Sequence, residues 1–225
     1  MNRTLEICTD ASIKTFQCGN IQRTFGCAGA LSIPTMEEDY LFSQDTTNNR
    51  SELLAIYLGL KLGKRIMDTN PGVYDSITIY SDSQFGVFGL TKWMPNWMRT
   101  RDANGVIYGS DGSPVKNQEL FMCILTYITT NNLYVAFKHC KGHVKYTSTK
   151  KLKNANETYF KSNGVYLRPE DIFKLAYYND IVDRSTREKL QTINPDYYSV
   201  MDYTNNYQIM AKYVIPNDYA RYMGE

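Results

Sequence analysis

The sequence predicts an α/β domain, a mixed five-stranded sheet flanked by helices. Three strand-like segments come first; a long helical segment, a strand, further helices, a second strand and a last helix follow. No internal repeat and no low-complexity linker divides this order. The 225 residues fit one domain with elaborations, since about 150 residues per domain is a usual prior.

The first half of the chain carries the first three strands and the first long helix. Apolar and other residues alternate over residues 5–10, which is typical of a strand. Residues 24–33 are small, apolar and β-branched, and residues 39–43 form a short third run, so we expect antiparallel pairing. Over residues 49–67 the apolar positions change to the helical period, which predicts an amphipathic helix.

The second half alternates strands and helices, predicted at residues 76–81 (strand), 83–90 (short helix), 117–130 (helix) and 133–139 (strand). Residues 91–114 hold both tryptophans, which are spaced by one helical turn, and then two turn signals.

The C-terminal part begins with a segment that lacks periodicity, residues 144–168. Pro169, followed by two acidic residues, marks the start of a helix that could run to about residue 190. We therefore expect one domain over residues 1–190, with an insertion at about 144–168. Residues 191–225 are expected to form an extension that packs on the domain or trails from it.

The composition is that of a folded chain inside the cell. Apolar residues make up 43%, charged residues 21%, and the net charge is +2, which argues against a disordered polyelectrolyte. No apolar stretch approaches the roughly 18 residues that a membrane span needs, and Glu6 and Asp10 interrupt any signal-peptide core. We expect a cytoplasmic protein with no membrane contact.

The five cysteines support the same location. Their number is odd, and they include no Cys-x-x-Cys pair and no histidine at zinc-finger spacing. Reduced thiols in a reducing compartment are the expected state.

Three acidic residues stand where predicted elements begin or end. Asp10 is expected to close the first strand, Asp82 follows the strand at 76–81, and Glu52 opens the first long helix. The ends of strands in open α/β sheets form the usual crevice for an active site. Taken singly, each acid is more commonly a turn residue or a helix cap.

A fourth acid lies on the last helix, where Asn179 and Asp183 share one face. Asp180 is the rival assignment, but on a helix it points about 100° away from Asn179. Four converging carboxylates repel one another unless divalent cations neutralise them, and oxygen ligands favour Mg²⁺ or Mn²⁺ over zinc.

Five short motifs occur in a fixed order: Thr9-Asp10-Ala11-Ser12, Thr46-Thr47-Asn48-Asn49-Arg50-Ser51-Glu52, Ser81-Asp82-Ser83-Gln84, Lys141-Gly142-His143 and Asn179-x-x-x-Asp183. Each motif alone is weak, but the ordered set resembles type 1 ribonuclease H. The resemblance covers about residues 5–190 and implies the ribonuclease H-like fold. In the first motif Ala11 stands where the family usually has glycine.

The resemblance implies an endonuclease that cuts the RNA strand of RNA/DNA hybrids, with a role in removing replication primers or stray hybrids. It assigns two Mg²⁺ ions, with Mn²⁺ as a substitute, to Asp10, Glu52, Asp82 and Asp183. It further implies 5′-phosphate and 3′-hydroxyl product ends. His143 would shuttle a proton or assist product release.

The resemblance also implies substrate contacts. Short amides could read the 2′-hydroxyls of the hybrid's minor groove, and Thr47 could take a phosphate of the DNA strand. The two tryptophans could lie against the DNA strand or pack on the core. The implied substrate-binding residues are Ser12, Thr47, Asn48, Asn49, Gln84, Trp93, Trp97 and Asn179.

The segment at 144–168 departs from the bacterial enzymes, in which this connection is short. It holds six basic residues against one acidic residue, a net charge of +5 in a chain whose total is +2. Two interpretations stay open: a solvated mobile loop, or an additional phosphate-binding flap beside the active site.

Two other functions remain as alternatives. Another nuclease of the same superfold, such as a junction resolvase, would share the acids without needing the amides. A non-catalytic nucleic-acid-binding module could have kept the fold. The first predicted strand starts at residue 5, so we expect no N-terminal hybrid-binding module and no attached polymerase. We also expect a monomer.

Overall fold

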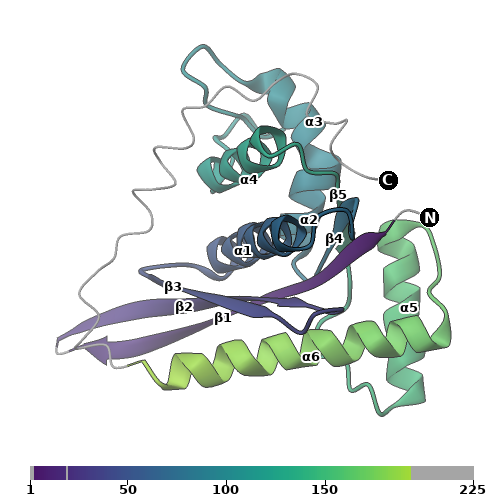
Figure 1. The fold of residues 1–225 in the computed structure, drawn as a ribbon. Coiled ribbons are helices and arrows are strands. Elements are labelled where there is room, and N and C mark those ends of the chain that lie inside the picture. Colours follow the sequence, from purple (N-terminus) through teal and green to yellow (C-terminus); the bar gives the residue numbers. More distant parts are fainter. Residues whose placement is uncertain (1–2, 19, 194–225) are drawn as a thin grey trace.

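The computed structural model describes residues 3–18 and 20–193, and within them five strands form one mixed sheet (Figure 1). The strands are β1 (Thr4–Cys18), β2 (Ile21–Ser32), β3 (Glu38–Gln44), β4 (Ser76–Ser81) and β5 (Val135–His139). Their order across the sheet is β3-β2-β1-β4-β5. The first three strands pair antiparallel, whereas β1, β4 and β5 run parallel. The predicted mixed five-stranded sheet flanked by helices is therefore confirmed.

Helices cover both faces of the sheet (Figure 1). On one face α1 (Asn48–Thr69) packs against β1, β2 and β3, and α4 (Gln118–Thr130) packs behind it. On the other face α6 (Pro169–Gln191) packs against β1 and β2, and α5 (Thr149–Asn163) contacts α6 and β5. Within the described residues, no helix is long and apolar enough to span a bilayer.

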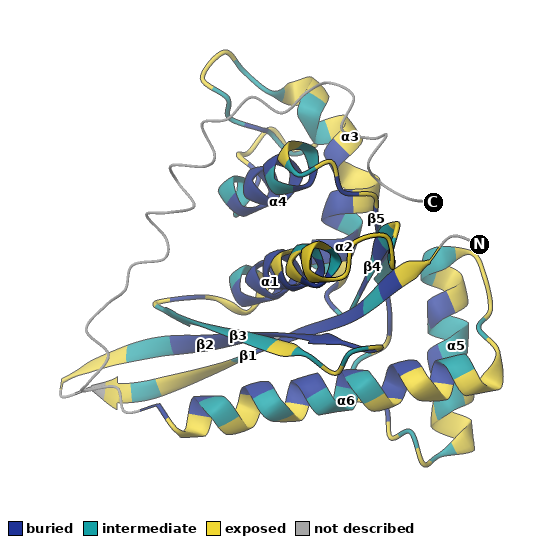
Figure 2. Ribbon diagram, viewed as in Figure 1, coloured by how far each residue is buried: buried dark blue, intermediate teal, exposed yellow. Residues whose placement is uncertain are grey.

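The main core lies between α1 and the sheet, and Figure 2 shows α1 buried along most of its length. Leu53, Ile56 and Leu60 project from α1, and Ile7 and Ile79 project from β1 and β4; all five are fully buried. This packing fixes the first turns of α1 relative to β1 and to the end of β4, so that Glu52, Asp10 and Asp82 (the residue after β4) are held near one another.

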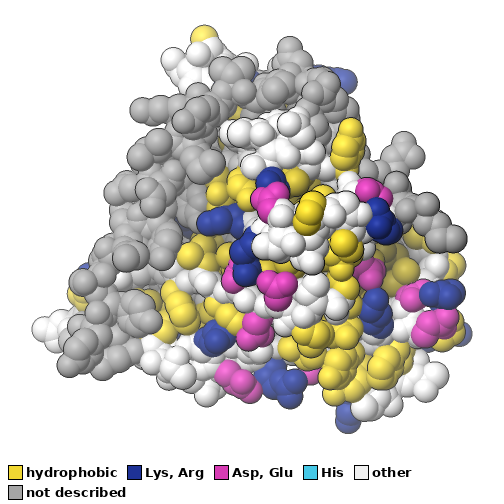
Figure 3. All heavy atoms as spheres, viewed as in Figure 1, with side chains coloured by type: hydrophobic (Ala, Val, Ile, Leu, Met, Phe, Trp, Pro, Cys, Tyr) yellow, Lys and Arg dark blue, Asp and Glu magenta, His cyan; other side chains and the backbone are white. Residues whose placement is uncertain are grey.

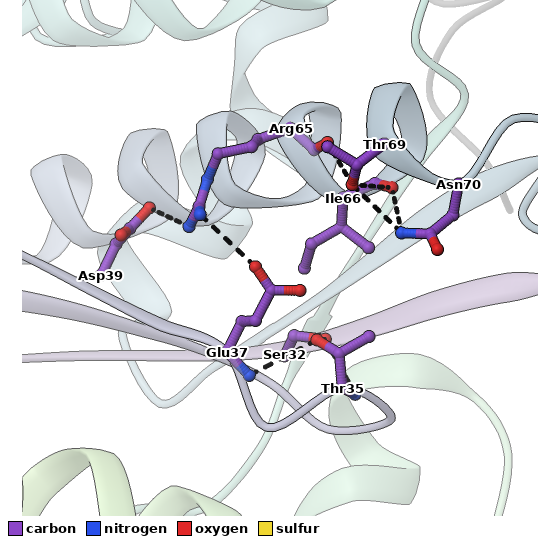
Figure 4. A network of polar contacts seen from close by, with 8 residues as sticks. All are labelled: Ser32, Thr35, Glu37, Asp39, Arg65, Ile66, Thr69 and Asn70. Carbon is purple, nitrogen blue, oxygen red and sulfur yellow. Dashed lines mark hydrogen bonds and ion pairs between the residues drawn. The ribbon is translucent and has the colours of Figure 1, made fainter.

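Polar contacts tie the C-terminal part of α1 to β3 and the turn before it, and cap the end of the helix (Figure 4). The Arg65 guanidinium pairs with Asp39 at 2.9 Å and with Glu37 at 3.4 Å. The side chain of Asn70 donates to the carbonyl of Ile66 at 2.9 Å. Figure 3 shows Lys and Arg side chains lying next to Asp and Glu on this face. Such exposed pairs each contribute about 0–1 kcal/mol, so the apolar core holds the fold together.

The first strand is longer than the sequence predicts. The strand β1 extends to Cys18, far beyond the expected end at residue 10, because it continues to pair with β2 after its pairing with β4 has ended. Ile13, Lys14 and Thr15 are exposed there, so this part of the strand has no buried face that would leave a pattern in the sequence.

Two segments without an expected element are helical. After α2 (Gln84–Phe88) the chain continues through a π-helical turn (Gly89–Trp93), α3 (Met94–Trp97) and a 3₁₀ turn (Met98–Thr100). The segment 144–168 contains α5, so a helix lies where one of the two interpretations had a loop. Ser148 caps the N-terminus of α5 and Gly164, with φ of 77°, ends it. The predicted extension at residues 191–225 lies almost wholly outside the described residues.

Candidate active site

Three acidic side chains meet at the centre of the sheet. One carboxylate oxygen from each of Asp10, Glu52 and Asp82 lies within 4.8 Å of the others. The parallel register pairs Thr9 with Ser81, so the residues that follow them, Asp10 and Asp82, are neighbours. Thr47 caps the N-terminus of α1, and Glu52 lies one turn further on.

The reason for this meeting differs from the expected one. Asp10 does not close its strand but lies in the middle of β1. It is β4 that ends, at Ser81, and from Asp10 onward β1 pairs only with β2. The crevice therefore opens where β1 loses its parallel neighbour.

The fourth acid, Asp183, lies on α6. Asp183 is only 4% exposed, and its Oδ2 accepts from Arg187 Nη2 at 2.5 Å and contacts His143 Nδ1 at 3.2 Å. A hydrogen bond of 2.9 Å between the hydroxyls of Ser12 and Thr186 ties β1 to α6 one turn later. Asp183 thus faces the other three acids, whereas Asp180 is only half-buried, on another side of the helix.

The acids destabilise one another electrostatically. Burial raises the pKa of the Asp10 carboxyl well above its usual range, and the charges of Asp82 and Asp183 raise it further. Burial also raises the pKa of Glu52, as do the other three acids. For Asp82 burial again raises the pKa, while the charge of His143 opposes the shift. A cation among these groups would reverse the penalty.

The donor set fits a hard divalent cation. All the converging ligand atoms are carboxylate oxygens, which Mg²⁺ and Mn²⁺ prefer. Glu52 Oε2 is buried and makes no hydrogen bond, so a ligand oxygen is left without a partner. Unsatisfied buried oxygens are rare in folded proteins, and a coordinated cation would account for this one.

The acids line an open cleft of about 570 Å³. The cleft brings together most of the residues implied by the resemblance: Asp10, Ser12, Asn48, Asn49, Glu52, Asp82, Gln84, His143 and Asp183. Asn179, one turn before Asp183 on α6, is not in the lining; it is 2% exposed, with its Nδ2 unpartnered. Thr47 is outside the lining, where its hydroxyl accepts from the backbone N–H of Arg50 at 3.4 Å.

The two tryptophans lie outside the cleft lining and differ in environment. Trp97 packs on the core, with its ring 5.4 Å from that of Phe121. Trp93 is 38% exposed and contacts Trp97, with ring centroids 5.6 Å apart. Trp97 is thus half-buried against the core, and Trp93 is the more exposed of the two rings.

Arg187 and His139 belong to the site although no sequence motif contains them, and Gly142 of the Lys141-Gly142-His143 motif has a packing role that the motif did not reveal. Arg187 lines the cleft and lowers the pKa of Asp10. Gly142 packs so tightly on Asp82 that an added Cβ would overlap the carboxylate. His139, 3% exposed, contacts the backbone carbonyl of Asp82 through Nε2 at 3.2 Å. In the sequence, only the four-residue spacing from Asp183 pointed to Arg187 as a site residue, and nothing pointed to His139.

Comparisons with known proteins point to one family. Residues 2–158 match the family model described as RNase H. Ribonuclease H of Bordetella avium (strain 197N) is 35% identical over 98 residues, which cover 44% of this chain and 54% of that protein. Ribonuclease HI of Haemophilus ducreyi (strain 35000HP / ATCC 700724) is 34% identical over 98 residues, with the same coverage. The chain thus spans about half the length of the curated relatives it matches.

Among solved structures, LC11-RNase H1 in complex with RNA/DNA hybrid is 17% identical and has a TM-score of 0.41; the match covers 70% of this chain and 97% of that one. The family match ends inside α5, before the helix that carries Asp183. The geometry, and not the family match, therefore brings the fourth acid to the cleft.

Proposed function

The chain belongs to the RNase H family, and we propose that it is an endonuclease that hydrolyses the RNA strand of RNA/DNA hybrids. The observation that carries the proposal is the meeting of Asp10, Glu52 and Asp82 within 4.8 Å, with Asp183 in the same cleft. Elements far apart in the sequence supply these acids, so their convergence is not a local turn effect.

The residues that would hold two Mg²⁺ ions, or Mn²⁺ in their place, are Asp10, Glu52, Asp82 and Asp183. When bound, a pair of divalent cations supplies an activated water and neutralises charge in an in-line phosphoryl displacement. The unpartnered Glu52 oxygen and the raised pKa values of three acids support this assignment. Hydrolysis would leave 5′-phosphate and 3′-hydroxyl ends.

His143 is assigned the proton transfer at the departing 3′ oxygen or the release of product. Its side chain is 72% exposed, and its backbone is held in the left-handed region with φ of 52°. The contact between Nδ1 and Asp183 orients the ring, and Nε2 is then the atom that exchanges the proton. Strained backbone at a site residue persists when the surrounding structure holds it.

Substrate recognition is assigned to polar side chains at the cleft's rim. The amides of Asn48, Asn49 and Gln84 are exposed and line the cleft, where they would bond 2′-hydroxyls in the minor groove. The hydroxyl of Ser12 and the buried amide of Asn179 would bind the substrate next to these amides. Thr47 and the exposed ring of Trp93 would contact the DNA strand. Trp97, half-buried against the core, would support the ring of Trp93 there.

The rim amides favour this function over a junction resolvase, which would need the acids alone. The retention of four acids and His143 favours an enzyme over a non-catalytic binding module.

We further propose that residues 1–190 act as one domain, with residues 191–225 as an extension, and that the protein works as a monomer in the cytoplasm. The buried thiols of Cys8, Cys27 and Cys140 are free, which agrees with a reducing compartment.

The substrate is tested with strand-labelled RNA/DNA hybrid, duplex RNA and duplex DNA, each incubated with Mg²⁺ and with EDTA. We expect cleavage of the RNA strand of the hybrid alone, abolished by EDTA. Asp10→Asn, purified in parallel, should be inactive, which controls for contaminating host nucleases. Cleavage of duplex DNA in preference to hybrid would favour the resolvase, and hybrid binding without any cleavage would favour the binding module.

The basic insertion at residues 144–168 also leads to a prediction about substrate binding. Lys150, Lys151 and Lys153 are exposed at the start of α5. If they bind phosphates, changing all three to glutamine should weaken hybrid binding and reduce the slope of log K against log salt by about 0.9 per lost contact. Fluorescence anisotropy at several salt concentrations measures both. Lys61→Gln on α1 is the control, and an unchanged slope in the triple variant would remove the phosphate-binding role.

A further inference from the structure

We infer that α5 positions Asp82 for catalysis, acting through Ser162, Asn163 and His139. The inference rests on the proposed function and gives the insertion a second role, distinct from phosphate binding. Ser162 and Asn163 form the last turn of α5, and His139 is the last residue of β5. Asp82 directly follows β4, the strand next to β5.

The imidazole of His139 bridges α5 and Asp82. Nδ1 lies 2.8 Å from the Ser162 hydroxyl, and Nε2 lies 3.2 Å from the backbone carbonyl of Asp82. A carbonyl oxygen only accepts, so Nε2 carries the hydrogen and donates it. In the neutral ring Nδ1 is then the acceptor, and the Ser162 hydroxyl donates to it. The Asp82 carbonyl therefore selects the tautomer, and the Ser162 hydroxyl, bonded to Nδ1, holds the ring in the orientation that keeps Nε2 on that carbonyl.

Asn163 fixes the backbone of the same histidine. Its Nδ2 donates to the His139 carbonyl at 2.8 Å, and its Oδ1 accepts from the His139 N–H at 3.2 Å. Asn163 thus pairs with both the N–H and the carbonyl of the last residue of β5, as a neighbouring strand would. Together, the two residues at the end of α5 make three hydrogen bonds to His139.

The helix that makes these bonds is itself firmly packed. Tyr159, 3% exposed, lies in a core cluster with Cys8, Cys140 and Leu175. Ala155, 1% exposed, packs with Val144, Ile172 and Ala176. Contacts from β1, from the loop after β5 and from α6 therefore hold α5 in place, and α5 can serve as a rigid support.

Asp82 needs such a support because it lies between two elements. Before it, Ser81 accepts from the N–H of Cys140 at 3.0 Å; after it, the Ser83 hydroxyl caps α2 by accepting from Gly86 at 3.1 Å. The bond from His139 fixes the peptide plane between these two anchors. The direction of the Asp82 carboxylate depends on that plane, so loss of the bond would let the carboxylate turn away from Asp10 and Glu52.

The test is Ser162→Ala in the full chain, with kcat and KM measured on RNA/DNA hybrid. Partners that orient a metal ligand typically change activity or metal affinity by about 10–100-fold when removed. We expect kcat to fall by about tenfold with KM unchanged, because substrate contacts stay intact. Ser162→Thr keeps the hydroxyl and should restore kcat. Thr158→Ala is the matched control: its hydroxyl bonds only the Asn154 carbonyl of its own helix at 3.0 Å.

A second readout does not depend on activity. Calorimetric titration with Mn²⁺ should show weaker binding to Ser162→Ala and to Asn163→Asp than to the wild type and to Thr158→Ala. If Ser162→Ala had the same kcat and the same affinity for Mn²⁺ as the wild type, the inference would be overturned. Equal losses in Ser162→Ala and Thr158→Ala would also overturn it, because they would indicate a general effect on α5. A wild type that does not cleave hybrid would instead contradict the proposed function, and the Mn²⁺ titration would still test the support.

Discussion

Glu52→Gln should abolish hybrid cleavage and, in metal-free buffer, raise the melting temperature of the protein. Loss of a cation ligand removes several kcal/mol of transition-state stabilisation, which predicts roughly a thousandfold fall in kcat. The gain in stability has a separate cause. Glu52 is buried beside three other acids, and the neutral amide removes its share of their repulsion. For a domain of this size each kcal/mol gained raises the melting temperature by about 2–4 °C.

The stability gain should depend on pH. The folded protein raises the pKa of Glu52 above the unfolded value of about 4.3, so between these two values the native state binds more protons than the unfolded state. The free energy of unfolding is therefore not reduced by Glu52 below about pH 4, where the residue is protonated in both states. It falls as the pH rises through the folded pKa, because Glu52 then becomes charged among the other acids. The difference between variant and wild type should be small near pH 4 and grow toward neutral pH.

Thermal unfolding in EDTA across this pH range measures the difference, with the exposed Glu188→Gln on α6 as the control. Adding Mg²⁺ should stabilise the wild type more than Glu52→Gln, because only a folded site with all its ligands binds the cation well. A variant that melts lower than the wild type at neutral pH in EDTA would show that the acids do not repel one another as described.

Gly142→Ala should reduce kcat by about a hundredfold, because small misplacements of reacting groups have effects of that size. An added Cβ would overlap Asp82 Oδ2 and lie 2.8 Å from its Cγ, so the carboxylate must move. Gly142 has no positive φ, so the close approach to Asp82, and not backbone conformation, requires glycine here. The adjacent exposed Lys141→Ala is the control, and steady-state kinetics on hybrid is the measurement. Wild-type turnover by Gly142→Ala would mean that the Asp82 position is not critical.

The sequence was informative wherever a chemical requirement leaves a short local pattern. The acids Asp10, Glu52 and Asp82 stand in recognisable motifs, and the strands and helices around them bury one face, which imposes a period on the sequence. The core elements α1, β4, α4 and β5 were predicted close to their observed positions for that reason.

The features that the sequence did not predict depend on tertiary contacts. Helix α5 buries fully only Ala155 and Tyr159 of its 15 residues, which is too few to produce a visible helical period. The outer half of β1 buries little and is held by pairing with β2. His139 becomes part of the site only because its ring reaches the backbone carbonyl of Asp82, and Arg187 only because α6 turns Asp183 toward the cleft.

A magnesium titration of hybrid cleavage, begun from metal-free protein in EDTA, tests the central claim most directly. The four-carboxylate site predicts no cleavage without the cation, a rise to a plateau as Mg²⁺ is added, and a flat response at every concentration for Asp10→Asn. Hybrid cleavage that continues at the wild-type rate in EDTA, or that Asp10→Asn still supports, would contradict it.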